Sequence, residues 1–127
     1  MAALDTNVLV RLVTRDDPAQ YAKAEAFVRQ QQPVLVTPLS LLELVWVLMS
    51  RYRHPKAKVC QVARALLQMV ELDIQQPAIL EAALRTWEGS KADFAACYIL
   101  ETVKAAGGTP LATFDGTPGR LDGGLRL

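Results

Sequence analysis

The hydrophobic and polar residues occur in a pattern that predicts short buried strands separated by longer helices. Short segments of three or four mainly apolar residues lie at 2–4, 34–36, 72–74 (which includes Asp73) and 110–113 and are predicted to be strands, and residues 125–127 are predicted to form a last edge strand. Runs this short and apolar are typical of strands covered on both faces. Between them, apolar residues recur at helical spacing and predict helices at 7–14, 18–31, 38–49, 56–70 and 77–87, and a last helix capped by Ser90 that ends before Gly107.

This order of elements predicts an α/β fold in which a parallel sheet is covered by helices on both faces. The 127 residues have room for one domain, 1–127, and no repeat or linker interrupts them. In open α/β sheets the functional crevice lies beyond the carboxyl ends of the strands. Polar residues that follow directly after a strand are therefore the first candidates for a site.

Composition excludes several classes of protein. About half of the residues (51%) are hydrophobic, which argues against disorder, and the net charge of +1 predicts no strongly basic surface. The most apolar segment, 39–49, is too short to span a bilayer, and the N-terminus lacks the basic and apolar regions of a signal peptide. Cys60 and Cys97 are too few and too far apart for a zinc site or a disulfide scaffold. We therefore expect a soluble, cytoplasmic protein without a membrane segment.

Four acidic residues are candidates for the site. Asp5 ends the first predicted strand, and Asp115 follows the fourth. Asp93 lies in the first turn of the helix capped by Ser90, and Glu43 lies inside the apolar helix 38–49. Each also has a structural explanation, because aspartate is common in turns and caps and the Ser90–Asp93 spacing fits a capping box.

Taken together, the acids favour a metal site. A desolvated, unpaired carboxylate at Glu43 would cost several kcal/mol, so this residue is expected to need a cation or a crevice. Asp5, Glu43 and Asp115 are predicted to meet at one end of the sheet, where clustered carboxylates repel one another unless a cation neutralises them. Ligands that are all oxygen favour Mg²⁺ or Mn²⁺. A site of this kind, without a glycine-rich phosphate loop, suits phosphodiester hydrolysis better than nucleotide binding.

Four segments carry a family resemblance that runs along nearly the whole chain. They are 4–12 (LDTNVLVRL), 41–48 (LLELVWVL), 92–95 (ADFA) and 113–115 (TFD). In order and spacing they resemble the PIN-domain VapC ribonucleases, the toxins of toxin–antitoxin pairs. The resemblance implies a three-layer α/β/α fold whose central, mainly parallel sheet has four to five strands. It also implies an Mg²⁺- or Mn²⁺-dependent endoribonuclease that cleaves RNA, forms a homodimer and is inhibited by a cognate antitoxin.

The resemblance also implies roles for single residues. Asp5, Glu43, Asp93 and Asp115 correspond to the metal-binding acids. Asn7 and Thr113 correspond to groups that orient these acids. The basic residues expected to contact RNA phosphates or an acidic antitoxin segment, if they are not simply solvated helix ends, are Arg11, Arg15, Arg51 and Arg53.

One departure from the family pattern leaves an alternative open. Close relatives commonly carry a second acid three residues after the one at Asp93, and here that position is Ala96. The alternative is therefore a catalytically impaired PIN fold that binds antitoxin or RNA without cleaving. A phosphotransferase with an aspartyl nucleophile is a further alternative. It would need a second carboxylate where the chain has Asn7, and a late lysine, whereas none follows Lys104.

Overall fold

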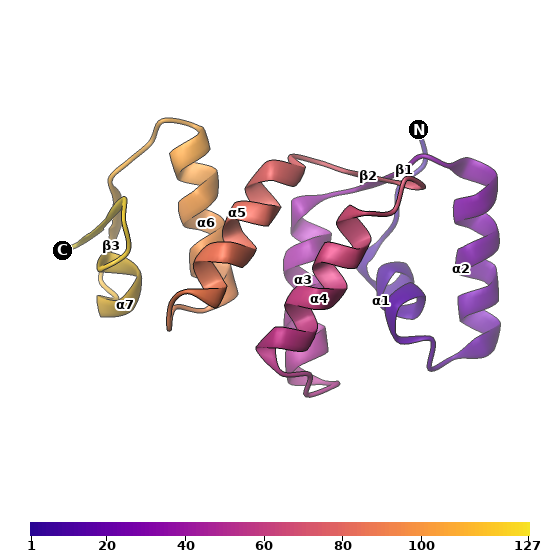
Figure 1. Cartoon of the computed structure of the whole chain (residues 1–127). Helices are drawn as coiled ribbons and strands as arrows, with labels where there is room; N and C mark the ends of the chain where they lie inside the picture. Colours follow the sequence, from indigo (N-terminus) through magenta and orange to yellow (C-terminus); the bar gives the residue numbers. More distant parts are fainter. The chain divides into compact units, whose positions relative to one another are not determined.

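The computed structural model describes residues 1–127, which divide into two compact units, Met1–Gln75 and Gln76–Leu127 (Figure 1). Each unit is described by itself. None of the helices combines the length and the apolar character that crossing a membrane requires.

The first unit contains parallel strands centred on β1 (Val34–Val36). On one side β1 pairs with β2 (Leu72–Ile74), with Val34 opposite Leu72 and Val36 opposite Ile74. On the other side it pairs with residues 2–4 through the parallel bridge between Ala3 and Leu35. The backbone N–H of Leu4 donates to the Leu35 carbonyl at 3.0 Å. The strands predicted at 34–36 and 72–74 are confirmed, and residues 2–4 form the expected third parallel segment.

Four helices surround these strands: α1 (Thr6–Thr14), α2 (Pro18–Gln31), α3 (Pro38–Ser50) and α4 (Lys56–Leu67). The starts of α2 and α3 follow from local chemistry. Asp17 accepts a hydrogen bond from the Gln20 N–H, Thr37 accepts one from the Ser40 N–H, and a proline occupies the first helical position in both. Helix α4 ends three residues earlier than predicted, where the Gln68 N–H donates to the carbonyls of the last turn.

The interior of the first unit is aliphatic. Helix α1 packs against α2 and α3, and α3 packs against α4. The side chains that fill the space between the helices and β1 are fully buried: Leu9, Val34, Val36, Leu41, Leu44, Leu48 and Val59. The opposite face of α3 is open, since Leu39 is 73% exposed and Trp46 is 62% exposed. Helix α3 is therefore apolar on two faces, of which only one is covered.

The second unit begins with a helical hairpin, α5 (Pro77–Glu88) and α6 (Phe94–Ala105), which pack against each other. The rings of Trp87, Phe94 and Tyr98 pack in series, tilted by 59° and 52°, with neighbouring centroids 5.2 Å apart. The predicted start of α6 is wrong by a few residues. Ser90 lies in the turn before the helix, and Asp93 is the N-cap, because its carboxylate accepts a hydrogen bond from the Ala96 N–H at 2.8 Å.

The rest of the second unit is a small parallel strand pair. Strands β3 (Leu111–Thr113) and β4 (Gly124–Arg126) are joined through a short helix, α7 (Gly116–Gly119), that the sequence did not predict. The chain passes along α6 and returns along β3, so the start of α6 and the end of β3 lie at the same end of this unit (Figure 1). Helix α7 packs closely on β4: a Cβ atom at Gly119 would lie 2.7 Å from the Arg126 Cβ and 3.1 Å from its backbone nitrogen.

Taken unit by unit, the architecture is a helix-rich α/β fold with short parallel strands. One sheet of four to five strands and a single domain over 1–127 remain predictions.

Candidate active site

Asp5 lies at the carboxyl edge of the strands in the first unit, where helix α3 also begins. Because residues 2–4 and β1 are parallel, with Ala3 opposite Leu35, Asp5 is level with Thr37, the N-cap of α3. Asp5 is the N-cap of α1, and its Oδ1 accepts a hydrogen bond from the Thr6 N–H at 2.7 Å. Both Asp5 and the nearby Asn7 are exposed. The predicted position of Asp5 at a carboxyl strand end is therefore correct, and the residue is also a helix cap.

A surface pocket of about 470 Å³ opens beside Asp5 and Asn7. Ala3, Leu4 and Val8 give it an apolar wall, and Phe27 on α2 faces them. The cationic side chains on its rim are Arg11 and Lys23. The first unit thus lines this hollow with one carboxylate, two carboxamides (Asn7 and Gln20) and two basic side chains.

Glu43 lies on the open face of α3, so the prediction that its apolar neighbours in sequence would desolvate it is wrong. The sequence predicted a carboxylate in apolar surroundings that would need a cation or a crevice. In the structure Glu43 is exposed. Its neighbours on the same face of the helix are Leu39, four residues before it, and Trp46, three residues after it, and both are exposed. Its carboxylate forms no hydrogen bond or ion pair and needs no partner, because water solvates it. It remains available as a ligand, but no burial penalty demands one.

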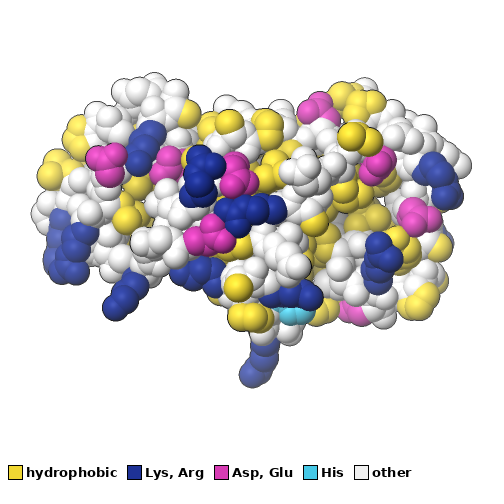
Figure 2. All heavy atoms as spheres, viewed as in Figure 1, with side chains coloured by type: hydrophobic (Ala, Val, Ile, Leu, Met, Phe, Trp, Pro, Cys, Tyr) yellow, Lys and Arg dark blue, Asp and Glu magenta, His cyan; other side chains and the backbone are white.

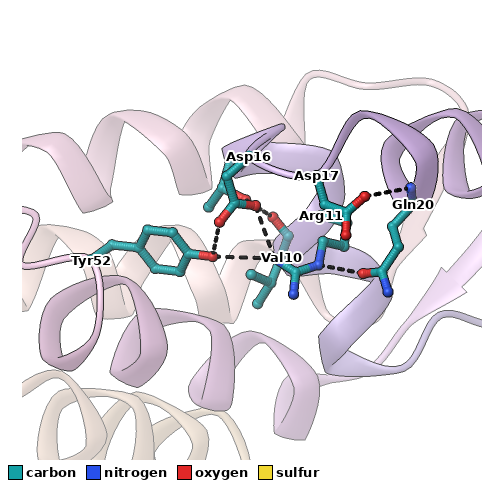
Figure 3. Close-up of polar contacts among 7 residues, drawn as sticks. Val10, Arg11, Asp16, Asp17, Gln20 and Tyr52 are labelled. Atoms are coloured by element: carbon teal, nitrogen blue, oxygen red, sulfur yellow. Dashed lines mark hydrogen bonds and ion pairs between the residues drawn. The ribbon is translucent and has the colours of Figure 1, made fainter.

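Arg11, which was expected to contact RNA or antitoxin, is occupied by contacts within the first unit (Figure 3). Its guanidinium contacts Asp16 at 2.9 Å and Gln20 at 2.6 Å, and Tyr52 donates a hydrogen bond to Asp16 at 2.6 Å. The hydrogen bond from Tyr52, followed by those from Thr14 and Arg11, lowers the pKa of Asp16 to about 2. This network connects the turn between α1 and α2 to the segment after α3.

The other predicted basic contacts are distributed differently. Arg15 has a left-handed backbone (φ 55°) at the end of α1, and its guanidinium lies 4.7 Å from the centre of the Tyr21 ring. Arg51 lines a small cavity of about 70 Å³ with Asn7 and Tyr52. Arg53 is exposed and has a left-handed backbone (φ 55°). Figure 2 shows basic and acidic side chains interspersed over the visible face, in agreement with the net charge of +1.

The second unit holds the other two acids. Asp93 is exposed and caps α6 through the Ala96 N–H, so Ala96 occupies the third position of the helix. Asp115 follows β3 and is exposed. Its own N–H donates to Thr113 Oγ1 at 3.0 Å, and its carboxylate makes no hydrogen bond within the protein. Thr113 thus fixes the backbone from which the Asp115 carboxylate projects.

Arg126 is a charged residue at this strand end that the sequence analysis did not select. It ends β4 and pairs in register with Thr113 on β3. Its Nη1 atom would lie 3.2 Å from a Cβ atom at Gly116, the residue that follows Asp115. No sequence motif marks Arg126; only the strand register brings it beside Thr113.

The donor atoms suit a hard divalent ion, because all four candidate acids offer carboxylate oxygens and all four are exposed. Asp5 and Asp93 each use one oxygen as a helix cap, which leaves the other oxygen for a ligand. The structure shows no group of three or more His, Cys, Asp or Glu side chains positioned to hold an ion. No three of the candidate carboxylates therefore lie close enough together in the structure to form an ion site.

Comparison with known protein families matches residues 2–123 to the PIN domain. No curated protein and no solved structure matches the chain. The match includes Asp5, Glu43, Asp93 and Asp115 and extends over both units. The chain belongs to the PIN domain family.

Proposed function

We propose that this PIN domain is an Mg²⁺- or Mn²⁺-dependent endoribonuclease of the VapC type and the toxin of a toxin–antitoxin pair. PIN domains are generally nucleases, and nucleases of this family generally use divalent metals. The observation that carries the proposal for this chain is the position of two acids. Asp5 ends the first parallel segment of one unit and Asp115 follows β3 in the other, and carboxyl strand ends are where α/β folds bear their sites.

In this proposal Asp5, Glu43, Asp93 and Asp115 are the ligands of the ion. Support comes from the carboxylates of Glu43 and Asp115, which are exposed and make no hydrogen bond within the protein. When bound, a divalent ion lowers the pKa of water and offsets charge on the phosphate. Asn7 beside Asp5 and Thr113 beneath Asp115 are the proposed orienting groups, and the hydrogen bond from Asp115 N–H to Thr113 Oγ1 supports the second of these.

The test is cleavage of a fluorescent single-stranded RNA by the purified chain with Mn²⁺ and with EDTA. We expect cleavage with Mn²⁺ alone, and a loss of two or more orders of magnitude in Asp115→Asn, because removing one charged ligand weakens the electrostatic stabilisation of the transition state by several kcal/mol. The matched control is Asp122→Asn, an exposed acid of the same unit that contacts only Lys104, loosely, at 3.8 Å. A wild-type chain that binds Mn²⁺ but leaves RNA intact would contradict the proposal.

The second candidate is a PIN fold that binds RNA or antitoxin with little cleavage, and Ala96 is the observation that favours it. Ala96 is one helical turn beyond Asp93, at the position where the VapC pattern that the chain resembles has another acid. Restoring the acid with Ala96→Asp is expected to raise Mn²⁺-dependent cleavage. It should also stabilise α6 slightly, because an acid in the first turn interacts favourably with the helix dipole. Unchanged cleavage in Ala96→Asp would rule out the missing acid as the cause of low activity.

The proposed partners are RNA, a cognate antitoxin and a second copy of the chain, together in the cytoplasm. PIN nucleases act on RNA and often pair with antitoxins. The open face of α3 supports a homodimer, since Leu39, Trp46 and Met49 expose apolar surface there. Of the four arginines predicted to contact RNA or antitoxin, Arg51 and Arg53 are exposed and form no ion pair or ring contact. Light scattering of wild type and Trp46→Glu tests the dimer, and a monomeric wild type at micromolar concentration would contradict it.

A further inference from the structure

Arg126 occupies a defined place in the second unit. In a parallel pair, residues opposite each other in register project from the same face of the sheet. Arg126 on β4 is opposite Thr113 on β3, so both side chains lie on one face at the carboxyl end of the pair. Two residues beyond Thr113 comes Asp115, whose N–H is held by the Thr113 hydroxyl. The arginine therefore stands beside the strand end that carries a proposed metal ligand.

The guanidinium of Arg126 lies close to the backbone of Gly116. A Cβ atom there would be 3.2 Å from Nη1 and 3.8 Å from Cζ, so the absence of a side chain at Gly116 leaves space for the arginine. Arg126 is exposed and forms no ion pair or side-chain hydrogen bond. Two other cations of this unit are paired: Lys104 contacts Glu101 at 3.4 Å, and Arg85 contacts Glu81 at 3.6 Å. Lys91 and Arg120 are exposed and unpaired like Arg126, but neither lies on the strand pair that leads to Asp115. Arg126 thus presents its donors to solvent next to Asp115.

We propose that Arg126 binds a phosphate group of the RNA beside Asp115. The inference rests on the proposed ribonuclease function, because carboxylates alone repel a polyanion and the net charge of +1 supplies little long-range attraction. A guanidinium offers paired donors that match the geometry of a phosphate. Arg126 is a substrate-binding residue in this scheme, and its two neighbours Thr113 and Gly116 set its position.

The experiment compares wild type with Arg126→Gln, Arg126→Lys and the control Arg120→Gln. Arg120 is exposed and is the C-cap that follows α7, and the control removes the same charge from the same unit. Binding of a fluorescein-labelled, 20-nucleotide single-stranded RNA is followed by anisotropy in EDTA over a series of salt concentrations, so that binding is measured without cleavage. Cleavage with Mn²⁺ then gives kcat and KM separately. Circular dichroism and thermal unfolding establish that each variant is folded.

For Arg126→Gln we expect RNA affinity to fall about tenfold or more, because a charge-assisted hydrogen bond is lost. The plot of log affinity against log salt should become shallower by about 0.7, the value for one phosphate contact on a single strand. Arg126→Lys keeps the charge without the paired donors, so it should keep the wild-type slope with an intermediate affinity. Arg120→Gln should retain both the slope and the affinity.

The outcomes separate this inference from the ribonuclease proposal. If wild type cleaves RNA and Arg126→Gln binds and cleaves as Arg120→Gln does, the role of Arg126 is refuted and the nuclease stands. If wild type binds RNA through Arg126 but does not cleave it, the nuclease is refuted and the phosphate contact stands. A wild type that neither binds nor cleaves RNA overturns both. If Arg126→Gln unfolds, Arg126→Lys decides, since an affinity equal to wild type would overturn the paired contact.

Discussion

Asp93 combines two roles that substitutions can separate. Its carboxylate caps α6 by accepting the Ala96 N–H at 2.8 Å, and we propose that the same group binds the metal ion. Asp93→Asn keeps an oxygen acceptor for the cap and removes the charge that a divalent ion needs. Asp93→Ala removes both the acceptor and the charge. Comparing the two variants tells whether the residue serves the helix, the ion or both.

The expected size of the capping effect follows from the structure. Replacing an aspartate N-cap by alanine costs about 1 kcal/mol, whereas asparagine caps about as well as aspartate. At about 2.1 cal/mol/K per residue, a chain of 127 residues has an unfolding entropy of about 270 cal/mol/K. Asp93→Ala should therefore lower Tm by about 4 °C, and Asp93→Asn should lower it by no more than about 1 °C. Both should lose Mn²⁺ affinity and RNA cleavage.

The control is Asp17→Ala. Asp17 caps α2 through the Gln20 N–H at 3.0 Å and is no proposed ligand, so this variant should lose a similar amount of stability and keep its activity. Tm is measured by calorimetry, Mn²⁺ affinity by titration calorimetry and cleavage with labelled RNA. If Asp93→Asn keeps Mn²⁺ affinity and cleavage, Asp93 is a cap alone and the proposed ligand set is wrong. If Asp93→Ala leaves Tm unchanged, the capping argument fails.

Two further predictions concern the first unit. The hydrogen bond from Tyr52 is the main cause of the low pKa of Asp16, which is about 2 against a usual 3.8. The ionised Asp16 therefore stabilises the fold above about pH 4, and this stabilisation is lost as the pH falls towards 2. Tyr52→Phe should therefore unfold at lower urea than wild type at pH 7, with a gap that narrows by pH 2.5; a gap independent of pH would show that Asp16 is not involved. The side chain of Leu9 on α1 is fully buried, so Leu9→Ala should cost about 2–5 kcal/mol in urea titrations. Val70→Ala, at a side chain that is 84% exposed, should change stability by less than about 0.5 kcal/mol. Equal effects of the two truncations would refute the assignment of the core.

The elements with local signals could be predicted from the sequence. Asp17 followed by proline marks the start of α2, and the β-branched run at 34–36 marks β1. The start of α6 was placed at Ser90 because Ser90 and Asp93 are both good N-caps at capping-box spacing, and only the backbone decides between them. Helix α7 has four residues, too few for a hydrophobic period to appear.

The candidate site was predictable where its residues follow strands. Asp5 and Asp115 are placed by the alternation of strands and helices alone. Glu43 shows the limit of that approach: its sequence neighbours Leu42 and Leu44 are apolar, but successive helical residues point in different directions, and Glu43 shares its face with exposed residues. The position of Arg126 could not be predicted, because its proximity to Thr113 depends on the pairing register of the two strands, and no local feature of either strand sets that register.

The close packing of α7 on β4 at Gly119 has a consequence for mutational tolerance. Any side chain at Gly119 meets the Cβ and backbone nitrogen of Arg126, so β4 must shift before the substitution fits. Such a shift moves Arg126 away from its partner Thr113 on β3. In a selection for variants that have lost the proposed RNA cleavage, Gly119 should accordingly be recovered alongside the acids, although it has no group that can bind an ion or a nucleotide. Gly119 would be intolerant to mutation because the backbones of α7 and β4 lie so close together. A survey that ranks positions by mutational sensitivity alone would mistake this glycine for a catalytic residue.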